Sequence, residues 1–289
     1  MNYQIPALKA KAEWLPWALQ CIRDYSGDYR KIEDCIMVKW LNVSQRTKAP
    51  STKNSLRAVF GPTLRHLQLI MGDGDRLDLM SKGKELLNVY EEQGEIAYKK
   101  TLAKHLIKLD QDRWGGLIFK IDKLGDNTTD SQVLNEMEGR QEGQLTKDKL
   151  RKALLYYEYV GLLAIEGKII KLRKPIFKNL VTGVDVKVSS SQFVEVLIKS
   201  YDRLQPESGG NPYIPIPALR EAVCEELRFW PDDFYELLEE IPKETSEYLI
   251  HLSQPMVRKL GGIRLGDKYL YYAAIYKKTE VERHNEHFS

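Results

Sequence analysis

The sequence predicts an α+β protein that is mostly helical and consists of three successive modules, each ending in a β-hairpin. Apolar residues recur at helical spacing over much of the chain, beginning at residues 14–25. In three places short apolar runs flank a turn, at Gly72 to Asp75, at Glu166-Gly167 and at Gly266-Asp267, a pattern typical of hairpins. The order of helices and hairpins places the expected modules at residues 1–90, 91–178 and 179–289.

The composition indicates a globular protein without a membrane span. The chain has 289 residues, of which 43% are hydrophobic, and its formal net charge of +3 does not by itself indicate a nucleic-acid partner. No apolar stretch reaches the roughly 20 residues of a spanning helix. Residues 1–11 lack the apolar core and cleavage site of a secretory signal. We therefore expect a cytoplasmic protein.

Cysteine and histidine usage predicts neither a disulfide nor a metal site. Cys21, Cys35 and Cys224 are odd in number, far apart and set among apolar residues, so we expect buried free thiols. Only His284 and His287 lie close together among the histidines, and no cysteine is near them, which argues against zinc. No cofactor is expected, because no glycine-rich phosphate loop is present.

The first module is expected to contain three helices followed by a hairpin and a fourth helix. Gly61-Pro62 can break or kink the third helix, and Ser81 is expected to cap the fourth, which carries Leu86 and Leu87. The expected elements are helices at 14–25, 32–41 and 51–67 and strands at 67–71 and 76–79.

The end of this module resembles winged-helix DNA-binding proteins. In that family a β-hairpin wing ends in an apolar-polar-apolar strand, followed by Ser or Thr, a Gly and a pair of Leu. The matching residues are Leu77, Leu79, Ser81, Gly83, Leu86 and Leu87. The resemblance covers residues 1–90 and implies a helix-turn-helix with a wing, a fold that contacts duplex DNA.

The second and third modules repeat the order of helices followed by a hairpin. Thr146 is expected to cap the helix before the second hairpin, which runs from Leu162 to Leu172. No repeat of fixed period is visible, so the division into tandem winged-helix-like modules depends on the order of elements. The remaining expected elements are helices opening at Glu95, at 133–137, 192–204, 218–227 and 232–241, a linker at 179–191 and a loop at 206–217.

Basic residues on three elements are the candidates for DNA contact. The helix from Ser51 occupies the place of a recognition helix, where Asn and Arg can read base edges and Lys can contact phosphate. A second basic group lies on the helix before the second hairpin and on that hairpin. An ordinary solvated helix face is the alternative for both groups. The candidate residues are Arg46, Lys48, Ser51, Lys53, Asn54, Arg57, Lys147, Lys149, Arg151, Lys152, Lys168, Lys171 and Arg173.

The third module is expected to avoid DNA and to dock on a protein partner. Its helix at 232–241 carries five acidic residues, which a polyanion would repel. The neighbouring aromatic residues are expected mainly in the core, with a protein interface as the alternative. They are Phe229, Trp230, Phe234, Tyr235, Tyr269, Tyr271 and Tyr272.

The predicted function is non-catalytic binding of double-stranded DNA by the first two modules, within a larger prokaryotic DNA-processing or defence complex. One alternative is a scaffold whose winged helices bind only protein. Another is a nuclease, because Glu166–Lys168 and Asp185–Lys187 each place an acid two residues before a lysine. Neither triplet has a recognisable supporting acid, so we predict no catalytic residue.

Overall fold

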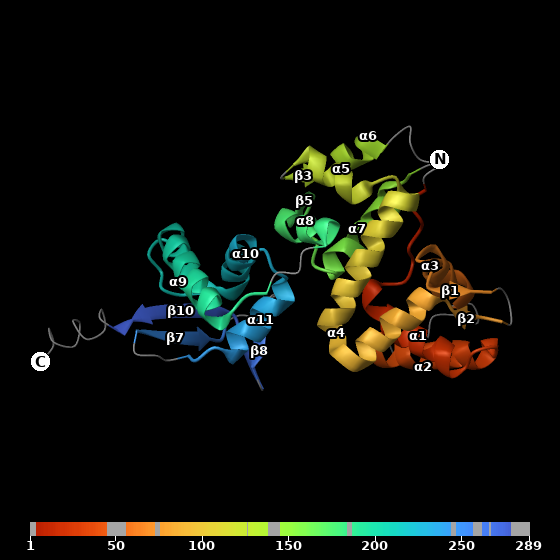
Figure 1. Ribbon diagram of the computed structural model, residues 1–289, viewed down its shortest axis with the longest axis horizontal. Coiled ribbons are helices and arrows are strands. Elements are labelled where there is room, and N and C mark those ends of the chain that lie inside the picture. Colours follow the sequence, from red (N-terminus) through yellow and green to blue (C-terminus); the bar gives the residue numbers. More distant parts are fainter. Residues whose placement is uncertain are drawn as a thin grey trace, which may run out of the picture. The chain divides into compact units, whose positions relative to one another are not determined.

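The computed structural model describes residues 4–44, 56–72, 76–125, 127–137, 145–183, 187–243, 247–256, 262–265 and 267–278, with backbone only at 40–44 and 265. The protein is α+β and mostly helical, as predicted, whereas the tandem winged-helix-like modules stay a prediction (Figure 1). It divides into two compact units, Met1–Phe177 and Lys178–Ser289, which are described separately below. The module boundary expected after residue 90 falls inside a helix, α4, of the first unit.

The first unit is built mainly from helices, with two small antiparallel sheets. Its elements are η1 (Ala12–Trp14), α1 (Leu15–Asp24), α2 (Tyr29–Ser44), η2 (Leu56–Phe60), α3 (Gly61–His66), β1 (Ile70–Met71), β2 (Asp78–Leu79), α4 (Ser81–Leu109), η3 (Asp110–Trp114), α5 (Leu117–Leu124), β3 (Thr128–Thr129), α6 (Asp130–Met137), α7 (Lys147–Tyr159), β4 (Leu163–Glu166), β5 (Ile169–Leu172) and the start of α8 (Lys174–Thr182).

A disulfide joins the first two helices of this unit. Pro16 lies in the first turn of α1, where it needs no amide donor, and α1 packs against α2. Cys21 is bonded to Cys35, with a Cα–Cα distance of 5.7 Å. The expectation that both are free thiols is therefore wrong, whereas Cys224 is free and buried as expected. Sequence spacing alone could not show that two packed helices bring these cysteines together.

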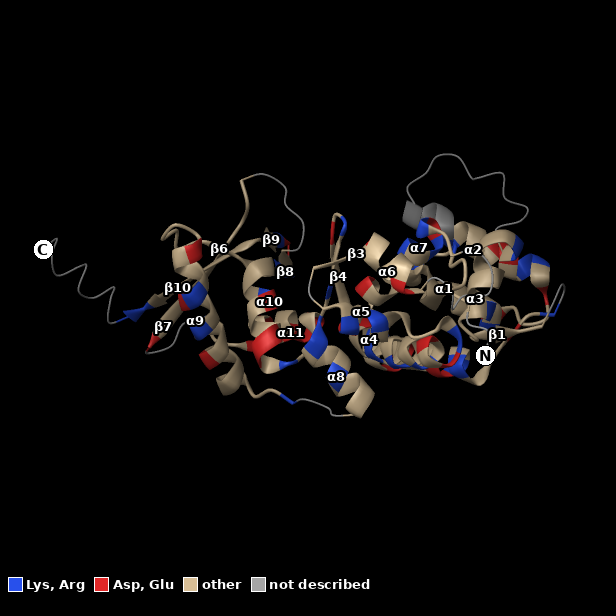
Figure 2. Cartoon of the chain, turned by 90° about the horizontal axis from the view of Figure 1, so that it is seen from above, with Lys and Arg blue, Asp and Glu red and all other residues tan. Residues whose placement is uncertain are grey.

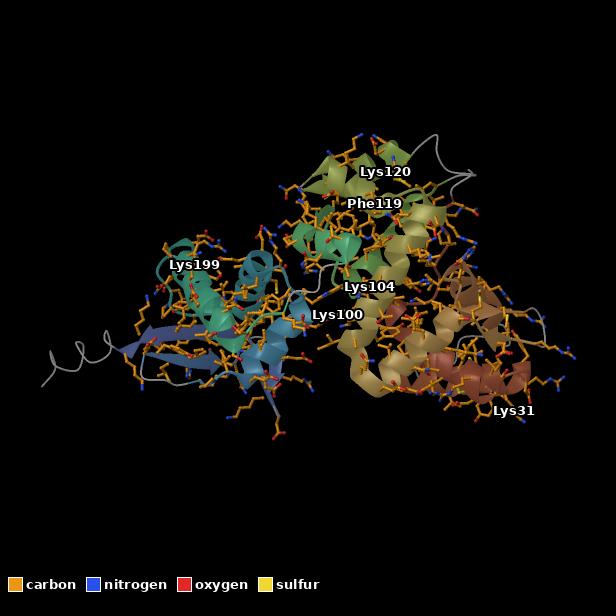
Figure 3. All side chains as sticks on the ribbon, viewed as in Figure 1. Lys31, Lys100, Lys104, Phe119, Lys120 and Lys199 are labelled. Carbon is orange, nitrogen blue, oxygen red and sulfur yellow. A yellow bond between two sulfur atoms is a disulfide. The ribbon has the colours of Figure 1, made fainter. Side chains whose placement is uncertain are left out.

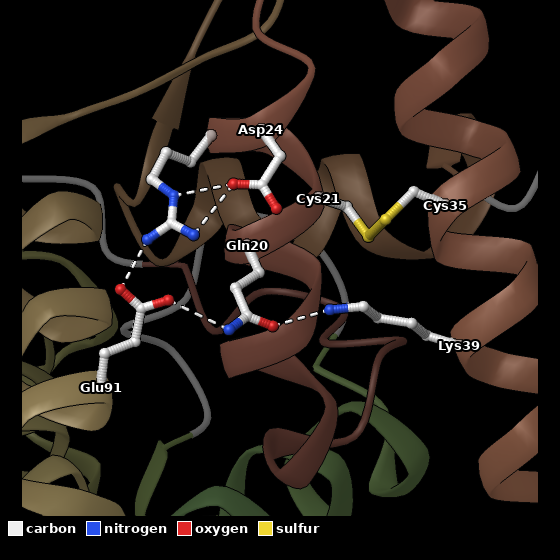
Figure 4. Close-up of polar contacts among 7 residues, drawn as sticks. Gln20, Cys21, Asp24, Cys35, Lys39 and Glu91 are labelled. Carbon is white, nitrogen blue, oxygen red and sulfur yellow. Dashed lines mark hydrogen bonds and ion pairs between the residues drawn. A yellow bond between two sulfur atoms is a disulfide. The ribbon is translucent and has the colours of Figure 1, made fainter.

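Polar side chains connect the same two helices to α4. Glu91 of α4 accepts hydrogen bonds from Arg23 Nη1, at 2.5 Å, and from Gln20 Nε2, at 3.0 Å. Gln20 in turn accepts from Lys39 Nζ of α2, at 2.6 Å. Figure 4 shows this network beside the disulfide. The interaction orients α1, α2 and α4 with respect to one another.

The first hairpin is present, but its junction with α4 differs from the prediction. Ile70 of β1 pairs with Leu79 of β2, while the expected turn at 73–75 lies outside the described residues. The predicted Ser81 cap is wrong, since Ser81 is the first residue of α4 and the capping position, Met80, forms no side-chain capping bond. A Cβ on Gly83 would lie 2.2 Å from the Leu69 carbonyl oxygen, so α4 packs directly on the hairpin backbone.

The long helix α4 bends at Gly94 and connects the two halves of the first unit (Figure 1). Gly94 has φ 84° and ψ −176°, a conformation that a residue with a side chain rarely adopts. Beyond the bend, Leu102 and Leu106 are buried. His105 Nε2 donates a hydrogen bond to the Leu67 carbonyl oxygen, at 2.6 Å, and its pKa is lowered mainly by burial.

The second half of the first unit places α7 against a three-stranded sheet of order β3-β5-β4. The predicted cap of α7 is confirmed, because Thr146 Oγ1 accepts from the Lys149 amide at 3.2 Å. The predicted hairpin is also confirmed, with Glu166 paired to Ile169 around Gly167, which has φ 64°. Trp114 and Tyr157 are buried in edge-to-face contact at 6.3 Å.

The second unit packs helices against a three-stranded sheet of order β6-β10-β7. Its core includes Phe193 and Phe234, whose ring centroids lie 5.5 Å apart, together with Ile250 and Ile275 from the sheet. A further hairpin, β8–β9, pairs Leu265 with Lys268 at the place of the third predicted hairpin, while Gly266 of its turn lies outside the described residues. The elements are the end of α8, α9 (Ser190–Glu207), β6 (Ile214–Pro215), α10 (Ile216–Leu227), α11 (Pro231–Glu240), β7 (Tyr248–Ser253), β8 (Ile263–Leu265), β9 (Lys268–Leu270) and β10 (Tyr272–Lys277).

Two predicted boundaries in this part of the chain were wrong. The segment expected as a linker from 179 begins within α8, which continues to Thr182. Pro206 lies inside α9 and not in the following loop. At the N-terminus of α9, Ser189 and Gln192 form a reciprocal capping box that fixes the start of this helix.

Candidate nucleic-acid interface

The residues predicted around the recognition helix are mostly not described. Arg46, Lys48, Ser51, Lys53 and Asn54 lie outside the described residues. Arg57 is described and exposed, on the π-helical turn before α3. Its guanidinium carbon lies 5.2 Å from the centre of the Tyr29 ring at the start of α2. This cation–π contact holds the Arg57 side chain against α2.

The second predicted basic group is brought together where α7 meets the β4–β5 hairpin. Arg151 of α7 donates from Nη2 to the Gly167 carbonyl oxygen at the hairpin turn, at 3.1 Å. Its Nη1 donates to Asp130 at the start of α6, at 3.2 Å. Asp130 is buried, so this half-exposed Arg151 anchors the hairpin turn to α6 and α7. Lys168, the next residue of the turn, is therefore held near α7.

Three further predicted cations have partners within this region. Lys152 pairs with Asp148 at 2.7 Å, and Lys171 pairs with Glu166 at 3.1 Å. These pairs are solvent-exposed and contribute little free energy, so the lysines can exchange their carboxylates for a phosphate. The predicted Arg173 has a structural contact, because its Nη1 donates to the carbonyl oxygens of Gly161 and Leu163, at 3.0 and 2.9 Å.

Lys147 and Lys168 remain as exposed cations of the predicted group. Among the residues that the structure describes, neither forms an ion pair or a hydrogen bond through its side chain. Lys149, in the first turn of α7 together with Lys147, is half-buried. The hairpin turn and the N-terminal half of α7 thus present lysines whose charge is available to an anionic partner.

Formal charge is distributed unevenly between the two units. Residues 1–177 contain 30 Lys and Arg and 23 Asp and Glu, a net charge of +7. Residues 178–289 contain 14 Lys and Arg and 18 Asp and Glu, a net charge of −4. Figure 2 shows that charges of both signs are spread over the described elements. The net charge of +3 for the whole chain therefore conceals a basic unit and an acidic unit.

The acidic helix expected in the third module is present as α11. Asp232 and Asp233 lie in its first turn, where the helix dipole favours negative charge. The core assignment of the adjacent aromatic residues is confirmed for Phe229 and Phe234, which are buried. Tyr235 is partly buried, and its hydroxyl accepts a hydrogen bond from Arg220 Nη1 at 2.7 Å. Trp230 is also partly buried, as are Tyr269 on β9, Tyr272 on β10 and Tyr271 between these strands.

Asp110 is a buried acid of the first unit with a structural role that the sequence did not indicate. Asp110 accepts hydrogen bonds from the amides of Leu117 and Ile118 at the start of α5, at 2.7 and 2.8 Å. Its burial raises its pKa to about 7, against the effect of the two amides. The turn Asp110–Trp114 folds back to make these bonds, so Asp110 holds the connection between α4 and α5.

The two acid–lysine triplets behind the nuclease alternative are only partly described. Glu166, from one of the two acid–lysine triplets, is exposed on the hairpin and paired with Lys171, and Asp185 from the other lies outside the described residues. Within the described part of the chain, no three His, Cys, Asp or Glu side chains are grouped so that they could hold a metal ion. None of its helices is both long and apolar enough to cross a bilayer.

Comparison with known proteins does not assign a family. The chain gives no significant match to a protein-family model, to a curated protein or to a solved structure.

Proposed function

We propose that the first unit binds double-stranded DNA through winged-helix-like elements, without catalysis, and that the protein works within a larger DNA-processing or defence complex. The net charge of +7 on residues 1–177 is the observation that carries this proposal. Exposed Lys147 and Lys168 lie on α7 and on the β4–β5 hairpin, a helix and a wing-like element joined by Arg151. Helix and wing are the elements that contact DNA in winged-helix proteins.

The second unit has the opposite charge and fits a protein partner better than DNA. Its net charge is −4, and Glu239 and Glu240 are exposed at the end of α11. Bringing these carboxylates close to phosphates would be electrostatically unfavourable. We therefore place the protein-docking function in residues 178–289. If the whole chain were a scaffold that binds only protein, its affinity for duplex DNA would be negligible.

Duplex binding as a function of salt concentration tests the proposal. A fluorescently labelled duplex, titrated with protein at several salt concentrations, should show log affinity falling linearly with log salt. Replacing Lys147 and Lys168 by Glu should weaken binding to unrelated sequences alike, because these side chains would contact phosphate. The matched control is Lys187→Glu with Lys268→Glu, two exposed lysines of the second unit, one of them on a hairpin.

The outcomes separate the proposal from its alternatives. Salt-dependent binding that is lost in the first pair of substitutions and kept in the control pair supports DNA binding by the first unit. Negligible duplex affinity of the folded wild-type protein contradicts it and favours a scaffold. Cleavage of plasmid DNA with magnesium or manganese that is abolished by Glu166→Ala would establish a nuclease instead.

A further inference from the structure

We propose that the Cys21–Cys35 disulfide is a redox switch: its reduction by a dithiol releases α2 from α1, and with α2 the contact that holds the Arg57 side chain. The release of α2 goes beyond the proposed function and does not depend on it. Its consequence for Arg57, a predicted DNA contact, rests on the proposed function. The bond joins two helices that are buried to very different extents.

The core of the first unit holds α1 much more firmly than α2. In α1 six of the ten residues are buried, among them Leu19 and Ile22. In α2 only Ile32 and Ile36 are buried among the side chains that the structure describes, those of residues 29–39. Apolar burial is the main favourable contribution to helix packing, and segments with little of it open locally. The bond therefore matters most for the attachment of α2.

The position of Arg57 depends on that attachment. Among the described elements, α2 packs chiefly against α1. Two of its side chains also reach η2: Glu33 accepts a hydrogen bond from the Leu56 amide, and the Tyr29 ring lies 5.2 Å from the Arg57 guanidinium carbon. Movement of α2 away from α1 would carry Tyr29 and Glu33 away from η2. Arg57 would then lose the ring that holds it.

A thiolate can reach the bond from the side of α2. Cys21 is fully buried, whereas Cys35 is only half-buried. Attack of one dithiol sulfur on the sulfur of Cys35 breaks the protein's S–S bond, forms a mixed disulfide and frees the Cys21 thiolate. The second dithiol sulfur then displaces Cys35. Two electrons and two protons pass to the two cysteines, and the reductant leaves as its own disulfide.

A lysine beside the bond favours its opening. Lys39 lies one turn after Cys35 on α2, and its ammonium group donates to Gln20 Oε1 at 2.6 Å, next to Cys21 (Figure 4). A nearby cation favours the thiolate form of a cysteine, and a better-stabilised thiolate leaves faster in thiol–disulfide exchange. The half-buried sulfur and the cation together distinguish this bond from one enclosed in an apolar core.

Trypsin cleavage at three exposed lysines shows which helix is released. Lys31 on α2, Lys104 on α4 and Lys199 on α9 are all exposed (Figure 3). Trypsin cuts only locally unfolded chain, so the rate at each site reports the opening of its own helix. Lys104 thereby reports unfolding of the first unit as a whole, and Lys199 reports unfolding of the second unit.

The full chain is compared in three forms without reductant, which would damage the protease. These are the oxidised wild type, the Cys21→Ala, Cys35→Ala variant that stands for the reduced state, and the Cys224→Ala variant that keeps the bond. Cleavage after Lys31 should be on the order of 100-fold faster in the double variant, since closure of a loop of about 15 residues is removed. The other two lysines should stay uncut while Lys31 is cut. The Cys224→Ala variant should behave as the wild type.

Reduction of the folded wild type completes the test of the switch. Treatment with dithiothreitol in native buffer, followed by alkylation, should label both Cys21 and Cys35 while tryptophan fluorescence remains that of the folded protein. Three results would each overturn the switch: equal cleavage after Lys31 with and without the bond, cleavage at Lys31 and Lys104 at the same rate, and a bond that yields to the reductant only in denaturant.

Duplex affinity separates the switch from the proposed function. Reduction should lower the affinity of the wild type by on the order of 10-fold at 0.1 M salt, the loss of one charged contact, and leave that of Arg57→Gln unchanged. Equal affinity of the oxidised and reduced wild type overturns the control of Arg57. If the oxidised protein binds no duplex, the proposed function is overturned, and tryptic cleavage still decides whether the bond holds α2.

Discussion

Removing the Cys21–Cys35 disulfide should destabilise the first unit by an amount that the length of the closed loop determines. The two cysteines are 14 residues apart in sequence. In the chain-entropy description, a crosslink that closes a loop of about 15 residues stabilises the folded state by about 3 kcal/mol at 25 °C. Cys21 is buried on α1, so its replacement by Ala, with Cys35→Ala, adds a small packing loss on α1.

Urea denaturation of the oxidised and the reduced protein measures this free energy. Tryptophan fluorescence is a suitable probe, because four of the five Trp residues belong to residues 1–177. The reduced wild type and the Cys21→Ala, Cys35→Ala variant should unfold at lower urea concentration than the oxidised wild type. Adding reductant should lower the urea midpoint of the oxidised wild type, and it should change the midpoints of the other two proteins far less.

Thiol titration in denaturant tests the assignment of the bond directly. The unreduced protein should show one reactive thiol, Cys224, and the reduced protein three. Replacing Cys224 by Ala should leave no reactive thiol in the unreduced protein. Three reactive thiols in protein purified without reductant would refute the disulfide and the stability argument with it.

Three further changes test contacts of the first unit. The pKa of Asp110 is raised from 3.8 to about 7, so its contribution to stability is complete below pH 4 and is lost as pH rises through 7. Between pH 4 and pH 7 the free energy of unfolding of the wild type should fall by on the order of 4 kcal/mol relative to that of the Asp110→Asn variant. Parallel curves of unfolding free energy against pH for the two proteins would contradict this. Gly83→Ala should destabilise by about 1–3 kcal/mol because its Cβ meets the Leu69 carbonyl oxygen at 2.2 Å, whereas helix propensity alone predicts a gain. Arg173→Gln should lower the melting temperature, since two carbonyl bonds are lost, and an unchanged value would show that they contribute nothing.

Features with a strong local signal could be predicted from the sequence. The hairpin at Glu166-Gly167 and the Thr146 cap follow from residues within one turn of each other, and both are present. The fold class followed from the spacing of apolar residues, which determines which face of each helix is buried. These signals are short-range, because turns and caps are formed by neighbouring residues.

Features that depend on contacts between distant residues could not be predicted in this way. The disulfide requires α1 and α2 to pack side by side, and Asp110 needs the chain to fold back to α5. The candidate site shows the same limit. Arg151 and Arg173 belong to the predicted basic group, but only the folded hairpin shows that their guanidinium groups bind backbone carbonyls.

Contacts on both sides of its bend constrain the length of α4. The first half of α4 packs on the β1–β2 hairpin at Gly83, and the second half is tied to Leu67 through His105. One residue inserted between Tyr98 and Leu102 would rotate everything after it by about 100°. That rotation would turn the buried face of the helix toward solvent. Insertions and deletions should therefore be tolerated in the surface loops of this unit and excluded from α4, whose length sets the spacing between its two halves.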